Sequence, residues 1–243
     1  MAKTLHLHES PAAVIVLGLV VWLLYITDHV LDACRANVNE KPARKRFFRQ
    51  HRVKTRVLAI VGAVVTAALA FCSLPAAVLH AGITFGLEVA GYFAFVHLAP
   101  TEWRVKWPRE LVVAVLFSPG TFLPLYAENT GKWMVFVAPC CCLIALCAMN
   151  CCAIECWECY DAEQVPSVSA HWITRHFGSI AVAAALAAIF VLPRAISLAV
   201  ALSACGLLTL NGVRQRWRAD AVRVLADAVM CTPALFLLFP WLG

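Results

Sequence analysis

Uninterrupted apolar stretches of about twenty residues recur along this chain, and they decide what it can fold into. Stretches of about 18 or more apolar residues are long enough to cross a membrane as helices. The 243-residue sequence is 62% hydrophobic and 14% charged, with a mean hydropathy of +0.79, unlike a water-soluble domain. The sequence therefore predicts an all-α, polytopic membrane bundle in a single domain that covers residues 1–243.

The first apolar stretch is interpreted as a retained helix rather than a signal peptide. It lacks a basic segment before it, and it runs directly into Asp28 instead of a small-residue cleavage site. Later stretches are separated by prolines such as Pro75 and Pro193, where chain breaks belong. We predict about eight transmembrane helices, at residues 11–31, 56–74, 77–98, 109–127, 133–153, 173–193, 195–212 and 221–241.

Lysine and arginine predict the orientation of these spans. Seventeen of the 20 basic residues fall in the loops after the first, third, fifth and seventh spans or at their edges. The positive-inside rule then places both termini outside and these loops on the cytoplasmic side of the membrane. The net charge of +6 is explained by this asymmetry, so nucleic acid is not an expected partner. The basic loop after the first span has two interpretations. It either sets the topology and attracts anionic membrane lipids, or it binds a phosphorylated ligand directly.

Two acidic clusters close apolar stretches on the predicted cytoplasmic side. Asp28 and Asp32 are four residues apart, so they share one face of a helix, and Glu155 and Glu158 share another. Asn150 lies about two turns before Glu158 on a similar face. Carboxylates next to lipid usually serve a site, and the helix dipole disfavours negative charge at a C-terminus. The two clusters therefore predict one shared cation.

The residue types favour Mg²⁺ and a lipid diphosphate. A small number of hard oxygen ligands, with room for water and phosphate oxygens, suits Mg²⁺. Arg35, Arg49 and Arg52 follow the first cluster and Arg175 follows the second, and guanidinium groups bind phosphate oxygens in a fork. The alternative is that these acids only pair with the basic loops at the surface.

These motifs resemble the UbiA superfamily of intramembrane prenyltransferases, in a divergent bacterial branch, and this resemblance implies a bacterial inner membrane. Family members carry two aspartate-rich motifs at cytoplasmic helix ends, and the first reads N-D-x-x-D-x-x-x-D. Asp28 and Asp32 match the last two aspartates of that motif, whereas Tyr25 stands in the place of its first aspartate. In the second, looser motif, Asn150, Glu155 and Glu158 stand in for aspartates. The family bundle usually has nine spans, so eight spans would fit if the first were absent.

The resemblance implies transfer of an isoprenoid group from a prenyl diphosphate to a lipophilic or aromatic acceptor, assisted by Mg²⁺. It implies Asp28, Asp32, Glu155 and Glu158 as catalytic residues that also bind the metal together with Asn150. The implied diphosphate partners are Arg35, Arg49, Arg52 and Arg175, and the candidate substrate-binding residues also include Tyr25 and Glu88. Tyr25 in place of a carboxylate also fits a non-catalytic relative that binds a polyprenyl lipid or a quinone-like molecule.

Two further acids have open roles. Glu88 falls near the middle of the third span, where it either serves an acceptor or forms a neutral hydrogen bond inside the bundle. Asp227 lies one turn after Arg223, an ordinary helical pairing, although a role in the site is the alternative.

Cysteine is concentrated in one stretch, because eight of the 12 cysteines lie between residues 140 and 159. Cys152, Cys156 and Cys159 would share a helical face and could bind a soft metal such as Cu(I) or Zn²⁺. Cysteine also packs as a small hydrophobic residue in buried helices, and that interpretation is favoured over a metal-handling protein.

Overall fold

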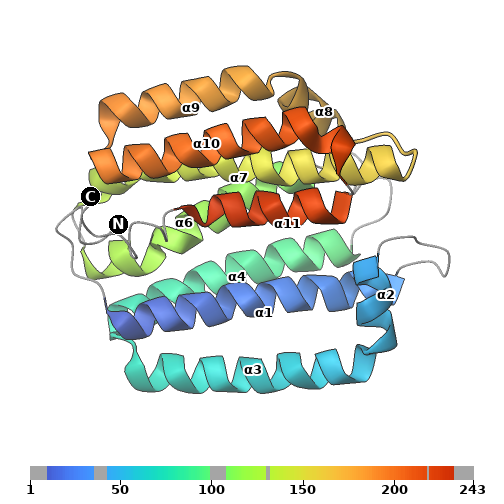
Figure 1. The fold of residues 1–243 in the computed structure, drawn as a ribbon. Helices are drawn as coiled ribbons and strands as arrows, with labels where there is room; N and C mark the ends of the chain where they lie inside the picture. Colours follow the sequence, from blue (N-terminus) through green and yellow to red (C-terminus); the bar gives the residue numbers. More distant parts are fainter. Residues whose placement is uncertain (1–9, 36–42, 99–107, 130–131, 218, 233–243) are drawn as a thin grey trace. The chain divides into compact units, whose positions relative to one another are not determined.

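Every regular element that the structure describes is a helix (Figure 1). The computed structural model describes residues 10–35, 43–98, 108–129, 132–217 and 219–232, and the side chains at 32–35, 43–46, 97 and 219–220 fall outside this description. The helices are α1 (Pro11–Arg35), α2 (Ala43–Gln50), α3 (Arg52–Ser73), α4 (Ala76–Leu98), α6 (Arg109–Glu128), α7 (Trp133–Asp161), α8 (Val168–Arg175), α9 (Phe177–Val191), α10 (Arg194–Val213) and α11 (Ala219–Met230), with a 3-10 turn η1 (Arg214–Arg216) before α11. The all-α prediction is confirmed for these residues.

Six of these helices, α1, α3, α4, α6, α7 and α10, are long and apolar enough to cross a membrane. The pair α8 and α9 adds a seventh if it is one span bent by 69°. The described helices are therefore compatible with an integral membrane protein. The eighth span was predicted at 221–241. Its residues 233–241 lie outside the described part of the chain, and the described part contains α11, which ends at Met230.

Proline ends the helices at the predicted places. Leu74 and Leu192 adopt extended backbone at the ends of α3 and α9, because the residue before a proline is disfavoured in the helical region. Helices α4 and α10 then begin at Ala76 and Arg194. The largest differences from the prediction are that α7 continues past residue 153 to Asp161 and that the span predicted at 173–193 is broken between α8 and α9.

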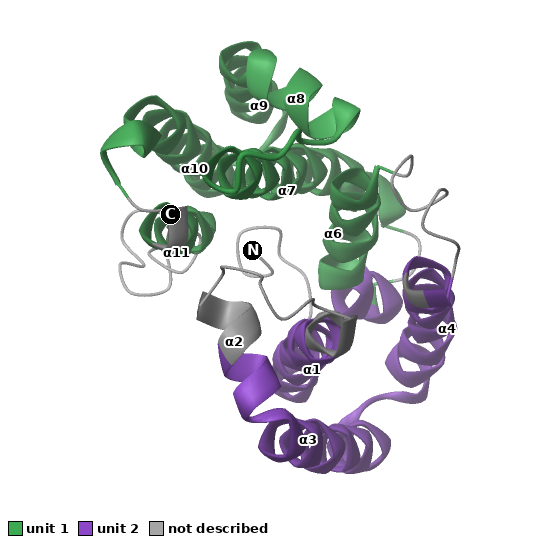
Figure 2. Cartoon of the chain, turned by 90° about the vertical axis from the view of Figure 1, so that its right-hand side faces the viewer, with its two compact units in different colours: residues 1–7, 99–122, 129–243 green, residues 8–98, 123–128 purple. Residues whose placement is uncertain are grey.

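The chain divides into two compact units, which Figure 2 shows in different colours. Unit 1 comprises residues 1–7, 99–122 and 129–243, and unit 2 comprises residues 8–98 and 123–128. The boundary cuts α6 near its end. The single-domain organisation predicted from the sequence stays a prediction.

Unit 1 is built around α7, which packs against α8, α9, α10 and α11. Met149, Cys152 and Cys156 of α7 are fully buried, and Leu207 of α10 is fully buried beside them. Gly206 of α10 lets α11 approach closely, since a Cβ atom there would lie 2.6 Å from a methyl group of Val229. Small side chains of this kind allow close helix packing inside a membrane.

Unit 2 is built around the pairing of α1 with α3, and α2 packs against both. Gly62 of α3 receives the ring of Trp22 from α1, and a Cβ atom at Gly62 would lie 2.5 Å from that ring. Thr66, one turn further along α3, is buried and donates its hydroxyl to the Gly62 carbonyl at 2.7 Å. A bulky ring against a glycine thus sets the closest approach of α1 and α3.

Candidate functional site

Polar side chains of α7 and α11 meet near the C-terminal end of α7 in unit 1. Asn150 donates its side-chain amide to Asp227 Oδ1 at 3.2 Å, and Arg223 Nη1 donates to Glu158 Oε1 at 2.7 Å. Both bonds join α7 to α11. Asn150 and Glu158 lie two turns apart on α7, and Arg223 and Asp227 lie one turn apart on α11. Together with Glu155, these residues are called the α7 polar cluster below: Asn150, Glu155, Glu158, Arg223 and Asp227.

The Arg223–Glu158 pair is partly accessible. The side chain of Arg223 is 21% exposed and that of Glu158 is 39% exposed. A charge-assisted bond of 2.7 Å is short and strong for its type, although partial exposure screens it. Because guanidinium carries five N–H donors and this bond engages Nη1, the group has the capacity to bind a second anion.

Glu155 connects α7 to the start of α8. Its Oε1 accepts a hydrogen bond from the Ser167 amide at 2.8 Å, and its Oε2 accepts one from the Ser167 hydroxyl at 3.0 Å. Ser167 is the N-cap residue of α8 and accepts from the Ala170 amide at 3.2 Å. Glu155 therefore orients the cap that begins α8. Sequence reasoning missed Ser167, although a serine after Pro166 and before an amphipathic helix is a helix-start signal.

Glu110, in the first turn of α6, was also missed. Its carboxyl group lies close enough to the Glu155 carboxyl group for the two to interact electrostatically. Glu110 and Asp227 both lie near the Cys151 side chain, so α6, α7 and α11 all contribute to this region of unit 1. An acid at the first turn of an apolar helix was the available sequence signal.

Two contacts anchor the same end of α7 to α10 and η1. Trp157 donates its ring N–H to Asn211 Oδ1 at 3.3 Å. The Arg214 guanidinium lies 4.6 Å from the centre of the Tyr160 ring, which is a cation–π arrangement. The α7 polar cluster is therefore held on a helix that is fixed by several neighbours.

In unit 2, a row of rings fixes α2 against the end of α1. The His29 ring lies 4.1 Å from the Tyr25 ring and 5.2 Å from the Phe48 ring, measured between ring centres. His29 Nδ1 lies 2.8 Å from the Tyr25 carbonyl oxygen. Asp28 is half-buried on the same helical turn as His29, and Arg49 of α2 is half-buried.

The remaining predicted site residues are dispersed. Arg52 begins α3 and is exposed, Arg175 ends α8 and is exposed, and the Tyr25 side chain is 49% exposed. Glu88 lies near the middle of α4, as expected, and its side chain is exposed. The side chains of Asp32 and Arg35 fall outside the described residues, although their backbone is part of α1.

The predicted meeting of the two acidic clusters stays a prediction. Asp28 and Asp32 belong to unit 2, whereas Asn150, Glu155 and Glu158 belong to unit 1. Within unit 1 the structure brings Asn150 and Glu158 together with Arg223 and Asp227, and it connects Glu155 to Ser167. Asp227 is therefore part of the candidate site through its hydrogen bond with Asn150, in addition to the pairing with Arg223 that the sequence predicts.

The cysteines of α7 mostly pack inside unit 1. Cys142, Cys147, Cys152 and Cys156 are buried in its hydrophobic core. Cys156 Sγ lies 3.0 Å from the Thr174 hydroxyl of α8, which is a contact between packed helices. Among the residues that the structure describes, no group of three or more His, Cys, Asp or Glu side chains is arranged as a metal cage.

Comparisons with known proteins give no match for this chain among protein-family models, curated proteins or solved structures.

Proposed function

We propose that this chain is a membrane-embedded prenyltransferase of the UbiA type, which transfers an isoprenoid group from a prenyl diphosphate to a lipophilic or aromatic acceptor. The observation that carries the proposal is the α7 polar cluster, in which the Asn150–Asp227 and Arg223–Glu158 bonds gather oxygen ligands and a guanidinium at one end of apolar helices. Carboxylates, amide oxygens and arginine are the groups that metal-assisted binding of a diphosphate requires.

The residues of this chain would bind the diphosphate and protect the prenyl cation. The planar guanidinium of Arg223 can bind phosphate oxygens in a fork, and in the structure it donates a hydrogen bond to the Glu158 carboxylate. The allylic carbon–oxygen bond breaks, the electron pair leaves with the diphosphate, and the acceptor forms a new bond to the allylic carbon and loses a proton. The apolar helices of the bundle exclude water that would otherwise capture the cation.

Mg²⁺ is implied by the resemblance, and hard oxygen donors on α7 support it. Asn150 Oδ1 is buried and has no hydrogen-bond partner among the described residues, so this hard amide oxygen has no competing donor. Mg²⁺ sites commonly use one or two carboxylates and keep water and substrate phosphates as the other ligands. Asn150, Glu155 and Glu158 would hold the ion, as the sequence also predicts for Asp28 and Asp32. When bound, Mg²⁺ would stabilise the charge of the leaving diphosphate.

A second candidate function is binding of a polyprenyl lipid or quinone without catalysis. The specific observation in its favour is that both glutamates of the second motif already accept hydrogen bonds, Glu155 from Ser167 and Glu158 from Arg223. Carboxylates used in this way stabilise the fold without any metal. Tyr25 in place of a motif aspartate agrees with this alternative.

The test is turnover of radiolabelled prenyl diphosphates by the purified chain, with Mg²⁺ and a panel of lipophilic and aromatic acceptors. Prenyl transfer should require Mg²⁺ and should fall by at least about a hundredfold in Asp28→Ala and in Arg223→Gln, because each removes a group that acts on the diphosphate. Glu163→Gln is the matched control, since Glu163 is an exposed acid in the turn after α7.

The alternatives separate in the same assay. Saturable binding of a prenyl lipid with no diphosphate release, for any chain length and acceptor, would favour the non-catalytic function. Unchanged turnover in Asp28→Ala and Arg223→Gln would contradict the proposed roles of both residues.

A further inference from the structure

Helix α2 lies in unit 2, where α1 ends and α3 begins. Figure 1 shows that it runs across the ends of these two helices instead of continuing either of them. Its eight residues include four cations and cannot cross a membrane, whereas the 22 residues of α3 rise by about 33 Å, close to the roughly 30 Å of a hydrocarbon core. With α3 across the membrane, α2 and the first turn of α3 lie at the level of the lipid headgroups.

Aromatic contacts fix which side of α2 faces outwards. The Phe48 ring is half-buried and packs 5.2 Å from the His29 ring of α1, measured between ring centres. The Phe47 ring is exposed, lies at 88° to the Phe48 ring, and packs 4.8 Å from the His51 ring between ring centres. Phe48 therefore anchors α2 to α1, and Phe47 stays at the surface beside the junction with α3.

The junction between α2 and α3 at His51 is well ordered by hydrogen bonds. The His51 amide donates to the Phe47 carbonyl oxygen at 3.0 Å, and the Thr55 amide donates to the His51 carbonyl oxygen at 2.9 Å. Thr55 is buried, and its hydroxyl donates to the same His51 oxygen at 3.0 Å. The backbone that carries residues 47–54 is therefore held by helical bonds on both sides of the junction.

Basic side chains flank this junction. Arg49 is half-buried in the last turn of α2, and Arg52 and Lys54 are exposed in the first turn of α3. Within the described residues, none of the three forms an ion pair with a carboxylate, so their charges are available to a partner. Phe47, Arg49, Arg52 and Lys54 are called the α2–α3 basic surface below.

Acidic residues do not neutralise this part of the chain. The sequence holds no Asp or Glu between residues 41 and 87. Residues 28–56, which include the acids at the end of α1, carry nine basic and three acidic residues, a net charge of +6. This value equals the net charge of the whole chain, so the attraction for an anionic partner is concentrated here.

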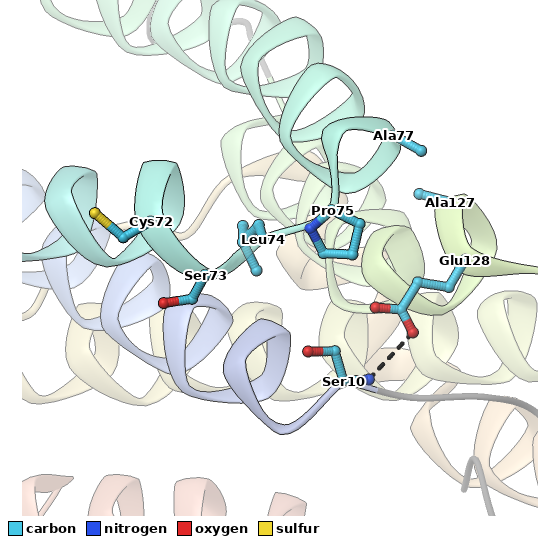
Figure 3. Close-up of a pocket in the computed structure, with 8 residues that line it drawn as sticks. All are labelled: Ser10, Cys72, Ser73, Leu74, Pro75, Ala77, Ala127 and Glu128. Carbon is cyan, nitrogen blue, oxygen red and sulfur yellow. Dashed lines mark hydrogen bonds between the residues drawn. The ribbon is translucent and has the colours of Figure 1, made fainter.

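The lining of a pocket at the other end of unit 2 has no such charge. Figure 3 shows this pocket between the start of α1, the turn that joins α3 to α4, and the end of α6. Its lining residues include no Lys or Arg, and the charged residue among them, Glu128, accepts a hydrogen bond from the Ser10 amide at 3.1 Å. An anionic headgroup is therefore attracted to the α2 end of unit 2 and not to this pocket.

Apolar side chains beside the cations favour a lipid over a soluble anion. The Phe47 ring is 53% exposed, and Val53 and Val57 of α3 are 74% and 54% exposed. Val53 and Val57 are four residues apart, so they share one face of α3. Such residues next to cations are typical of helices at a membrane surface, where the apolar groups meet the upper acyl chains and the cations meet phosphate.

We propose that the α2–α3 basic surface binds the phosphate groups of anionic phospholipids in the leaflet at this end of unit 2. The guanidinium groups of Arg49 and Arg52 bind phosphate oxygens in a fork, and the Lys54 ammonium adds a point charge. The Phe47 ring lies between the headgroups and the acyl chains. Arg49 and Arg52 thus serve lipid headgroups instead of the substrate diphosphate that the resemblance implies, and this role is independent of the proposed reaction.

The experiment uses the full chain in nanodiscs of phosphatidylcholine that contain a small amount of phosphatidylglycerol with a photoreactive group at the top of its acyl chain. After irradiation, labelled peptides are mapped by mass spectrometry. We expect label at residues 47–54 at least about tenfold above that from a phosphatidylcholine probe with the same photoreactive group. Residues 72–77, beside the pocket at the other end of unit 2, should show no such preference.

Variants that remove or keep the charge make the result specific. Each cation near an anionic surface raises lipid affinity by about fivefold, so Arg49→Gln combined with Arg52→Gln should lower the labelling by phosphatidylglycerol by at least about tenfold. Arg49→Lys combined with Arg52→Lys keeps both charges and should stay within about threefold of the unaltered chain. Lys54→Gln, at an exposed position, should lose about fivefold and carries the test if the double Gln variant does not fold. Arg194→Gln is the matched control, since Arg194 is an exposed arginine at the start of α10 in unit 1.

Three results would overturn the proposal. They are equal labelling of residues 47–54 by the two probes, unchanged labelling in a folded variant that lacks the charge, and loss of labelling when sodium pyrophosphate replaces sodium chloride at equal ionic strength. The last result would mean that a soluble diphosphate occupies the surface. Prenyl transfer is measured separately in the same preparations, so its absence would not count against lipid binding, and failure of lipid binding would not count against the proposed reaction.

Discussion

Helices α1 and α7 are equally apolar, yet α7 is the buried centre of unit 1 and α1 is mostly half-buried or exposed. Their most apolar stretches have the same mean hydropathy, but 44% of that stretch is buried in α7 and 17% in α1. The lipid interior is as apolar as the inside of a helical bundle, so hydropathy alone does not separate the two environments. The number of packing neighbours does, because α7 packs against α8, α9, α10 and α11, whereas α1 packs against α3 and α2.

The most direct test of this difference is truncation of a large side chain on each helix. Met149→Ala in α7 removes a side chain with 0% exposure and should cost about 2–5 kcal/mol, because the cavity is not refilled. Ile15→Ala in α1 removes a side chain with 60% exposure and should cost less than about 1 kcal/mol. Reversible unfolding in mixed micelles, followed by circular dichroism, measures both. Equal losses would break the distinction between the helices.

Glycine substitutions sharpen the comparison, because both units contain one very close helix approach. Gly206→Ala and Gly62→Ala would place a Cβ atom 2.6 Å from Val229 and 2.5 Å from Trp22, respectively. Each should destabilise the protein by about 1–3 kcal/mol through overpacking. Gly82→Ala in α4 is the control, since nothing lies within 4 Å of its new Cβ atom. If Gly62→Ala behaved like the control, the α1–α3 contact would be looser than described.

The α8 cap should have a smaller effect. Ser167→Ala removes the N-cap hydroxyl and one of the two bonds to Glu155, which should cost about 0.5–2 kcal/mol. Ser179→Ala, at an exposed position in α9, should leave stability unchanged. A double-mutant cycle with Glu155→Gln should give a coupling of about 0.5–3 kcal/mol. Additive losses would mean that Glu155 does not act on the cap.

The smallest expected effect on stability concerns the Arg223–Glu158 pair. Because both side chains are partly exposed, a double-mutant cycle of Arg223→Gln with Glu158→Gln should give a coupling of about 0.2–1 kcal/mol, reduced by added salt. Arg216→Gln, at an exposed position in η1, is the matched control. A large, salt-insensitive coupling would assign this pair to the buried framework of α7 rather than to an accessible binding site.

Much of the fold follows from local sequence. Apolar length predicts the helices, and Pro75 and Pro193 predict two of their junctions, because both signals depend only on neighbouring residues. The predicted membrane span ended at residue 153, because the last turns of α7 are polar, whereas the helical spacing of Glu155 and Glu158 already indicated helix beyond it. Contacts with distant residues such as Asn211 and Arg223 hold these turns. The break at His176 was missed because no proline or glycine precedes it to mark the end of α8.

The candidate site was only partly visible in the sequence. The spacing of Glu155 and Glu158 predicted a shared helical face, but it gave no indication of their partners. Ser167 lies 12 residues from Glu155 and Arg223 lies 65 residues from Glu158, so both pairings depend on how α8 and α11 pack on α7. For the same reason, the sequence predicted that Asp227 pairs mainly with Arg223, whereas the structure shows that Asp227 accepts a hydrogen bond from the Asn150 side-chain amide.

The bend between α8 and α9 has a consequence for the lipid around the protein. Helix α9 has 15 residues and a rise of about 22 Å, which is shorter than the roughly 30 Å of a typical hydrocarbon core. A segment this short is accommodated when the bilayer thins around it. Where α9 crosses the membrane, the bilayer beside it should therefore be thinner than the bilayer beside the 20-residue α10.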